Sequence, residues 1–201
     1  MPDNFPPHSS HLAEIEIVLK FLQGVVPERN AVYVSSPITS GQRYIKWVKT
    51  HPDNEGYSGD NQNPEFVANV IEKNLEHAKS VVKKIREAFP RKALIDPTAV
   101  PDVEGWKQGD YRYAWGRIIE EFTDLAVFSN DWQFSSGCVY EYLIGKRKGV
   151  EILDEDLQDL TIDKALYLIK GAVESMRAND LPVEFHESVY AEISEYIPVE
   201  V

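Results

Sequence analysis

The chain has 201 residues, of which 43% are hydrophobic and 27% charged, enough for one globular domain with a real core. The formal net charge of −12 argues against duplex nucleic acid or an anionic membrane surface as the main partner. The single cysteine, Cys138, rules out an internal disulfide, and no apolar run reaches the length of a membrane span. Because the start also lacks the regions of a signal peptide, we expect a cytoplasmic protein.

Predicted helices and strands alternate along most of the chain. A Pro-rich start over residues 1–8 is followed by Ser9 and Ser10, either of which can cap the first helix. In chain order, the patterns predict a helix over 11–24, a strand over 31–35, a long polar loop over 50–64, a helix over 66–89, a strand over 93–97, a helix over 111–122, a strand over 125–128, a helix over 136–146, a strand over 149–153, and helices near 161–178 and 186–196.

This alternation predicts an α/β fold with a parallel sheet and right-handed crossovers. We expect a three-layer flavodoxin-like (Rossmann-like) sheet of about four to five strands, with helices on both faces. Its simplest strand order is 2-1-3-4. Residues 1–30 form an N-terminal segment and helix, and residues 31–155 form the α/β domain. Residues 156–201 form a helical C-terminal extension, which packs on the domain or on a second subunit.

In the strand order 2-1-3-4, the second strand is added on one side of the first strand and the third strand on the other side. The order therefore reverses between the first and third strands. Ligands of open α/β sheets bind beyond the carboxyl ends of the strands at such a reversal. The loops that meet there are Ser35–Arg43 and Ser129–Ser136. Both loops carry small polar residues, so the topology predicts the binding site between them.

The first of these loops offers donors for an anion. Ser36, Ser40 and Gly41 suit a nest of backbone N–H groups, and Arg43 adds a charge-assisted contact to a phosphate. The alternative is an ordinary strand-to-helix turn whose hydroxyls only cap the backbone. No Gly-Lys-Ser/Thr sequence follows, so this is not a Walker loop, and it lacks the glycine pattern of a dinucleotide-binding turn.

The second loop leads into a helix that carries one carboxylate. Ser135, Ser136 and Gly137 stand at the start of this helix, and Glu141 follows about one turn later. The simplest interpretation is an N-cap and a surface glutamate. However, the surrounding residues are apolar, and a buried carboxylate is seldom without a use. At a nucleoside-sized pocket it suits cleavage of a glycosidic bond, whose transition state resembles an oxocarbenium ion.

Together these segments resemble a known family. The sequence from Tyr33 to Gly41, and Asp124-Leu125-Ala126-Val127 followed by Trp132 and Ser135 to Glu141, resemble the nucleoside 2-deoxyribosyltransferase superfamily. They are closer to its nucleotide N-hydrolase branch and to deoxyribosyltransferase-like proteins with a Trp-x-x-Ser-x-Gly motif. The resemblance covers roughly residues 31–153.

The resemblance implies roles for particular residues. Glu141 becomes the nucleophile, and Tyr33 the strand-end tyrosine near the sugar. The acid that protonates the base has no clean match, because Tyr113 stands nearest to its position; Asp110, one turn earlier, is the candidate. The predicted substrate-binding residues are Ser36, Ile38, Ser40, Gly41, Arg43, Trp132, Ser135, Ser136 and Gly137.

We therefore expect an N-hydrolase or 2-deoxyribosyltransferase acting on a nucleoside or nucleoside 5′-monophosphate, without a cofactor. The five histidines show no metal-ligand spacing, so no metal is predicted. One alternative is a non-catalytic nucleotide-binding or sensing module, and another is an NAD glycohydrolase. The resemblance also implies a homodimer or larger homo-oligomer.

Overall fold

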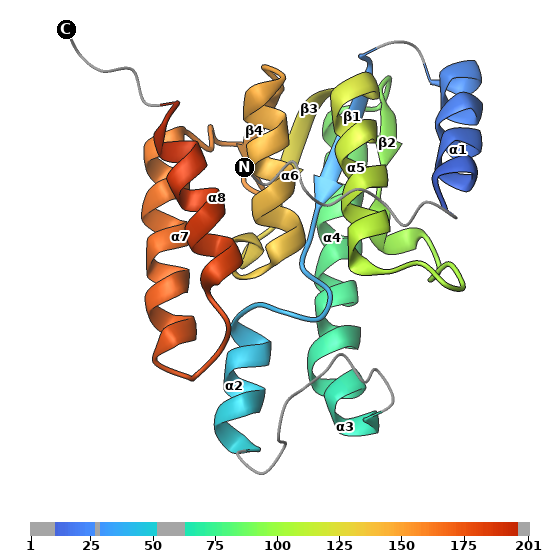
Figure 1. The fold of residues 1–201 in the computed structure, drawn as a ribbon. Helices are drawn as coiled ribbons and strands as arrows, with labels where there is room; N and C mark the ends of the chain where they lie inside the picture. Colours follow the sequence, from blue (N-terminus) through green and yellow to red (C-terminus); the bar gives the residue numbers. More distant parts are fainter. Residues whose placement is uncertain (1–10, 27–28, 52–62, 197–201) are drawn as a thin grey trace, which may run out of the picture.

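Four parallel strands form one sheet in the order β2-β1-β3-β4, which confirms the predicted topology. The computed structural model describes residues 11–26, 29–51 and 63–196. The central strands are β1 (Ala31–Ser35) and β3 (Thr123–Phe128), and the edge strands are β2 (Ala93–Ile95) and β4 (Glu151–Asp154) (Figure 1). All five residues of β1 are buried, as expected for a strand covered on both faces.

Helices flank the sheet and connect its strands. They are α1 (Leu12–Val25), α2 (Gln42–Thr50), α3 (Pro64–Phe66), the π-helical turn η1 (Val67–Ile71), α4 (Glu72–Ala88), the 3₁₀ turn η2 (Pro97–Ala99), α5 (Gln108–Phe122), the 3₁₀ turn η3 (Trp132–Phe134), α6 (Ser136–Arg147), α7 (Ile162–Arg177) and α8 (Glu184–Ser194). Every predicted helix has a counterpart here. The sequence patterns did not predict α2, because nine residues are too few for helical periodicity to be read.

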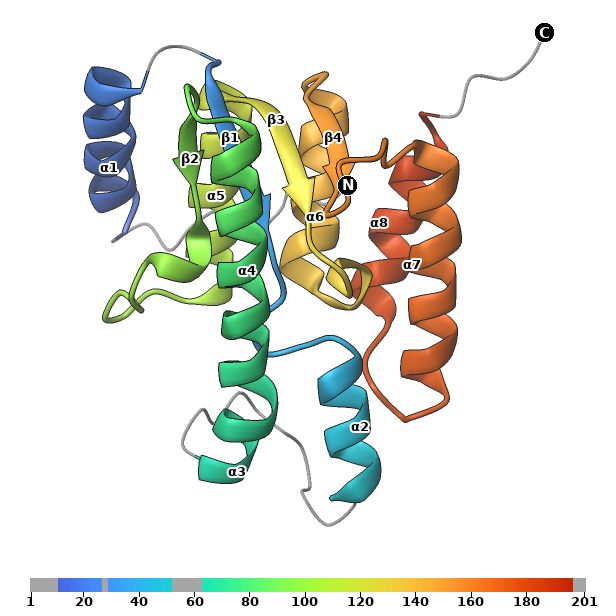
Figure 2. The ribbon, with the colours of Figure 1, turned by 180° about the vertical axis from the view of Figure 1, so that it is seen from behind.

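The sheet lies between two layers of helices, in agreement with the predicted three-layer flavodoxin-like fold. Side chains alternate along β1, so Val32 and Val34 pack with Val81 and Ile85 of α4 on one face. The opposite face packs against α5 and α6 and shares one buried cluster with them. Figures 1 and 2 show α4 on one side of the sheet and α5 and α6 on the other.

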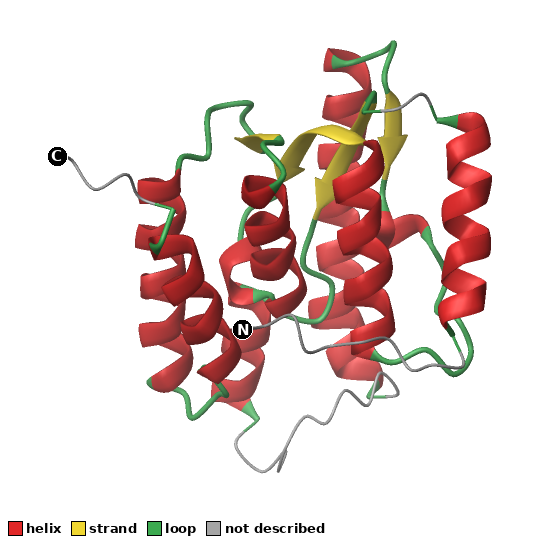
Figure 3. Ribbon diagram, turned by 45° about the horizontal axis from the view of Figure 1, so that its top comes forward, coloured by secondary structure: helices red, strands yellow, loops and turns green. Residues whose placement is uncertain are grey.

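The C-terminal helices α7 and α8 pack beside α6 and belong to the same core. Their buried side chains join the cluster that covers the α5/α6 face of the sheet; among them are Ala165, Ile169, Val189 and Ile193. Figure 3 shows both helices at the β4 side of the yellow sheet. Of the two predicted arrangements, this is packing on the chain's own domain. Within the described residues, no helix is long and apolar enough to cross a membrane.

Some predicted boundaries shift for local reasons. The helix predicted over 111–122 begins at Gln108, because Asp110 caps its first turn by accepting the N–H of Lys107 at 2.8 Å. The predicted helix over 66–89 runs from Pro64 to Ala88 and contains the π turn η1. The predicted caps Ser9 and Ser10, and most of the predicted 50–64 loop, lie outside the described residues.

The strands all end at the same edge of the sheet, and the loops after β1, β2 and β3 meet there (Figure 1). The backbone N–H of Ser129, just after β3, donates to the carbonyl of Ser35 at 2.9 Å and so joins two of these loops. Helices α2 and α3 lie beyond this edge. This places the two predicted site loops next to each other.

Candidate functional site

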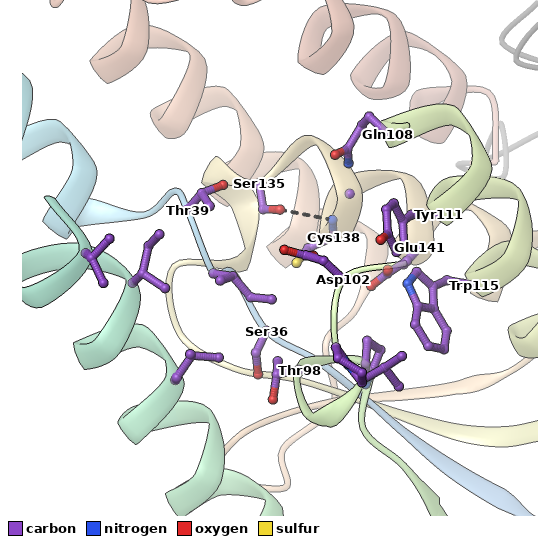
Figure 4. A pocket seen from close by; sticks show the side chains of 18 residues that line it. Ser36, Thr39, Thr98, Asp102, Gln108, Tyr111, Trp115, Ser135, Cys138 and Glu141 are labelled. Atoms are coloured by element: carbon purple, nitrogen blue, oxygen red, sulfur yellow. Dashed lines mark hydrogen bonds between the residues drawn. The ribbon is translucent and has the colours of Figure 1, made fainter. Parts of the chain in front are cut away.

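A cavity of about 590 Å³ lies at the carboxyl edge of the sheet, within the size range of small-molecule sites. Figure 4 shows it from close by. Its wall comprises Ser36, Ile38 and Thr39 after β1; Val67, Ile71 and Leu75 of η1 and α4; Pro97, Thr98, Val100, Pro101 and Asp102 after β2; Gln108, Tyr111 and Trp115 of α5; and Ser135, Gly137, Cys138 and Glu141 at the start of α6. One side of the cavity is therefore apolar, and the α6 side is polar.

Glu141 is buried in the cavity wall, with only 9% of its surface exposed, and both carboxylate oxygens are bound. The Tyr33 hydroxyl donates to Oε1 at 2.9 Å, and the Ser35 hydroxyl donates to Oε2 at 2.6 Å. Both donors come from β1. The sequence argument placed Glu141 opposite this strand, and the structure brings them together. The direct partner is Ser35, whereas Ser36 lines the cavity beside it.

Burial raises the pKa of Glu141 to about 7, although the hydrogen bonds from Ser35 and Tyr33 act in the opposite direction. Burial, reinforced by the charge of Glu141, also raises the pKa of the Cys138 thiol to about 12. At neutral pH the thiol therefore stays protonated, while a substantial fraction of Glu141 is ionised. Of these two groups, Glu141 is the available nucleophile.

These pKa values predict a pH dependence. If Glu141 reacts as a carboxylate, the acid limb of the kcat/KM profile should lie near pH 7, with kcat/KM falling by about tenfold per unit below it. Tyr33→Phe and Ser35→Ala should each move this limb to higher pH, because each removes a hydrogen bond to the charged form. Both expectations are tested by measuring kcat/KM against pH for the wild-type protein and the two variants. A limb at the ordinary carboxyl pKa, unmoved by either substitution, would contradict it.

The loop after β1 is held in place by Asn74 of α4, which is almost fully buried. Its side-chain amide donates to the carbonyls of Ile38 and Ser40 at 2.8 and 2.9 Å. Its Oδ1 accepts a hydrogen bond from the Arg43 guanidinium at 2.9 Å. Asn74 thus fixes the loop that carries Ser36 and Ile38 into the cavity wall.

Asn74→Ala should destabilise the protein by about 2 kcal/mol, because it leaves two partly buried carbonyls without a donor. It should also weaken activity by about tenfold, since the loop loses its register against the cavity. Asn69→Ala on the exposed side of the same helical segment is the matched control. Urea unfolding with kinetics measures both effects. Equal losses in the two variants would show that Asn74 has no special role.

A carboxylate of the protein occupies the start of α2, in the loop predicted to hold phosphate. Asp131 Oδ2 accepts the backbone N–H of Gln42 at 3.0 Å. Gly41 precedes it with a φ of +94°, and a Cβ there would lie 3.2 Å from the Cβ of Asp131. Gly41 is therefore needed for both its conformation and this close approach. The two site loops are joined by this contact.

Several predicted site residues lie away from the cavity. Asp110 is 1% exposed and serves as the α5 cap, so its carboxylate is engaged in holding the helix start. Trp132 packs in the core, stacked on Tyr142 with ring centroids 5.1 Å apart. Arg43 is bound to Asn74, as described above. Ser40, Gly41 and Ser136 are also not among the residues that line the cavity.

Other predicted residues do reach the cavity. Ser36, Ile38, Ser135 and Gly137 line it together with Glu141. The Ser36 hydroxyl has no hydrogen-bond partner within the described part of the chain. Such a hydroxyl at the wall is available to a hydroxyl of a bound ligand. The Ser135 hydroxyl caps α6 by accepting the N–H of Cys138 at 3.3 Å.

The sequence analysis missed Asp102 and Gln108, which line the cavity from the loop after β2 and the start of α5. It assigned no site to that loop, because its predicted second strand ended at an Asp-Pro turn without a motif. It also missed the apolar wall from η1 and α4, because apolar periodicity does not distinguish a cavity wall from a core.

Comparisons with protein-family models, with curated proteins and with solved structures give no match. The resemblance to nucleoside 2-deoxyribosyltransferases thus stands on residues of this chain alone. Among the described residues, no group of three or more histidine, cysteine, aspartate or glutamate side chains is placed to hold a metal ion. The geometry around Glu141 is therefore the basis for assigning a function.

Proposed function

We propose that this protein cleaves or transfers the N-glycosidic bond of a nucleoside or a nucleoside 5′-monophosphate, as an N-hydrolase or 2-deoxyribosyltransferase. One observation carries the proposal: a carboxylate held by two β1 hydroxyls, Tyr33 and Ser35, lies in the wall of a nucleoside-sized cavity. Those hydrogen bonds fix both oxygens of Glu141, which orients the carboxylate toward a bound sugar.

In the proposed reaction, an oxygen of Glu141 attacks the anomeric carbon of the sugar. The carbon–nitrogen bond breaks, and its electron pair leaves with the base, which takes up a proton. Water then attacks the resulting glycosyl ester to give the free sugar, or the nitrogen of a second base attacks it to give a new nucleoside. Either outcome regenerates the Glu141 carboxylate.

The rest of the cavity suits the two halves of a nucleoside. Trp115 and Tyr111 supply aromatic surface on which a base can stack. Ser36 and Thr98 supply hydroxyls for the sugar. The apolar wall from η1 and α4 excludes water from one side, which protects a reactive glycosyl ester until the acceptor arrives.

A chromatographic screen for free base tests the proposal. The purified protein is incubated with natural nucleosides, their 5′-monophosphates and NAD, each with and without a second free base. Base release supports the proposal, and a new nucleoside in the presence of the second base identifies a transferase. Saturable binding without release over hours would overturn it in favour of a nucleotide-sensing module. Release of nicotinamide from NAD alone would favour an NAD glycohydrolase.

We also expect the protein to act in the cytoplasm as a homodimer or larger homo-oligomer, with a small nucleoside or nucleotide as its ligand. The family resemblance supports the oligomer. Composition supports the location, because a chain with a single cysteine cannot form an internal disulfide.

A further inference from the structure

A second carboxylate, that of Asp102, lies in the cavity with Glu141. Asp102 and Glu141 are the two carboxylates among the described residues that line the cavity. None of these lining residues is a lysine, an arginine or a histidine. Departure of a base as an anion is slow, so efficient cleavage needs a proton donor near the leaving nitrogen. Asp110, the acid considered from the sequence, is committed to the α5 cap.

The other groups near the cavity that carry a transferable proton are phenols, a thiol and alcohol hydroxyls, which are weaker acids than a carboxyl group. The Tyr33 hydroxyl donates to Glu141, and the Tyr111 hydroxyl accepts the backbone N–H of Val103 at 2.7 Å. The Cys138 thiol is buried and holds its proton tightly, because burial raises its pKa to about 12. Asp102 is exposed at the cavity wall and is therefore free to meet a ligand.

The loop that carries Asp102 is anchored to α5. The next residue, Val103, is bound through its N–H to the Tyr111 hydroxyl, and its carbonyl accepts the N–H of Trp106 at 3.1 Å. The rings of Trp106 and Tyr111 pack with centroids 5.2 Å apart. Figure 4 shows Asp102 reaching from this loop into the cavity toward the first turn of α6. The anchoring holds the backbone next to Asp102 against α5.

We infer that Asp102 is the acid that protonates the leaving base, an inference that rests on the proposed function. As the carbon–nitrogen bond breaks, the Asp102 carboxyl gives its proton to a nitrogen or oxygen of the base, and the base departs neutral. Water, or a nitrogen of an incoming base, then attacks the anomeric carbon of the glycosyl ester, the bond to Glu141 breaks, and the proton of the attacking group returns to Asp102. No oxidant, reductant or further reactant is needed.

The test compares leaving bases that differ in their need for a proton. N7-methylation makes a purine cationic, so it departs neutral without protonation. Asp102→Asn should reduce kcat/KM about a hundredfold for a purine nucleoside that the wild-type protein cleaves. It should change kcat/KM less than about threefold for the N7-methylated form. For a pyrimidine substrate, a 5-fluorinated base, whose anion leaves more readily, serves the same comparison.

Glu104→Gln, an exposed change on the same loop outside the cavity wall, is the matched control and should leave both rates unchanged. Equal losses of the Asp102→Asn variant on both forms, or no loss on either, would overturn the inference while leaving the proposed function intact. Loss on both forms in a Glu141 variant is expected in either case. Absence of base release from every nucleoside in the wild-type protein would instead overturn the proposed function.

Discussion

Glu141→Gln is expected to reduce base release by about a thousandfold or more. The amide keeps the shape of the side chain, and its oxygen still accepts from one β1 hydroxyl while its NH2 group donates to the other, but it cannot form a glycosyl ester. The loss should therefore appear in kcat, while binding of the nucleoside changes little. Steady-state kinetics, with calorimetric titration of the variant by the same nucleoside, separates these two effects.

Glu192→Gln is the matched control, since it makes the same change at a mostly buried carboxylate that pairs with Arg147 away from the cavity. This control should retain activity within about twofold. Base release by the Glu141→Gln protein at the wild-type rate would remove Glu141 from the reaction. A covalent adduct with a 2-fluoro sugar substrate, mapped to Glu141 by mass spectrometry, would supply positive support.

The Glu141→Gln variant should also be more stable to unfolding than the wild-type protein above neutral pH. Burial raises the folded-state pKa of Glu141 from 4.5 to about 7, so ionisation opposes folding. The wild-type protein should thus lose up to about 3 kcal/mol as pH rises through this range. A glutamine cannot ionise, and its advantage in Tm should be roughly 5–10 °C at pH 8 and small near pH 4. Such a gain is typical of a site that sacrifices stability for reactivity.

The sheet and the place of the site could be predicted because both follow from short-range patterns. Alternating strands and helices restrict a parallel sheet to few strand orders, and the reversal between β1 and β3 fixes where loops converge. The apolar residues around Glu141 indicated its burial. The family resemblance implied that Tyr33 lies near Glu141, although neither it nor the patterns could show which β1 hydroxyl faces each oxygen.

Contacts between distant segments could not be predicted in the same way. Arg43 is separated from Asn74 by 31 residues, and nothing in the sequence indicates that this guanidinium binds an amide instead of a ligand. Asp131 fills the start of α2 because a loop 89 residues away folds against it. Trp132 stands in a motif typical of a ligand-binding loop, yet its ring packs on Tyr142 because the η3 turn directs it into the core.

These contacts bear on which of the two substrate classes fits the cavity. At both anion sites predicted from the sequence, a side chain of the protein already accepts one backbone N–H: Asp131 accepts that of Gln42 in α2, and the Ser135 hydroxyl accepts that of Cys138 in α6. The guanidinium of Arg112 is turned to the Ser136 hydroxyl at 2.9 Å and lies over the Phe185 ring. No lysine or arginine is among the described residues that line the cavity, and the sequence of the segments outside the described residues contains none.

An uncharged nucleoside should therefore be a better substrate than its 5′-monophosphate. A phosphate charge roughly 8 Å from one carboxylate costs about 2 kcal/mol at an effective dielectric constant of about 20, or roughly thirtyfold in kcat/KM. Added salt should reduce the difference in kcat/KM between the nucleoside and its 5′-monophosphate, because it screens the repulsion between the phosphate and the carboxylate. Thr39→Lys, which places a cation in the cavity wall, should also narrow it, whereas Thr50→Lys on the exposed part of α2 should not. Faster cleavage of the monophosphate by the wild-type protein would show that the backbone N–H groups at the start of α6 outweigh the carboxylates Asp102 and Glu141.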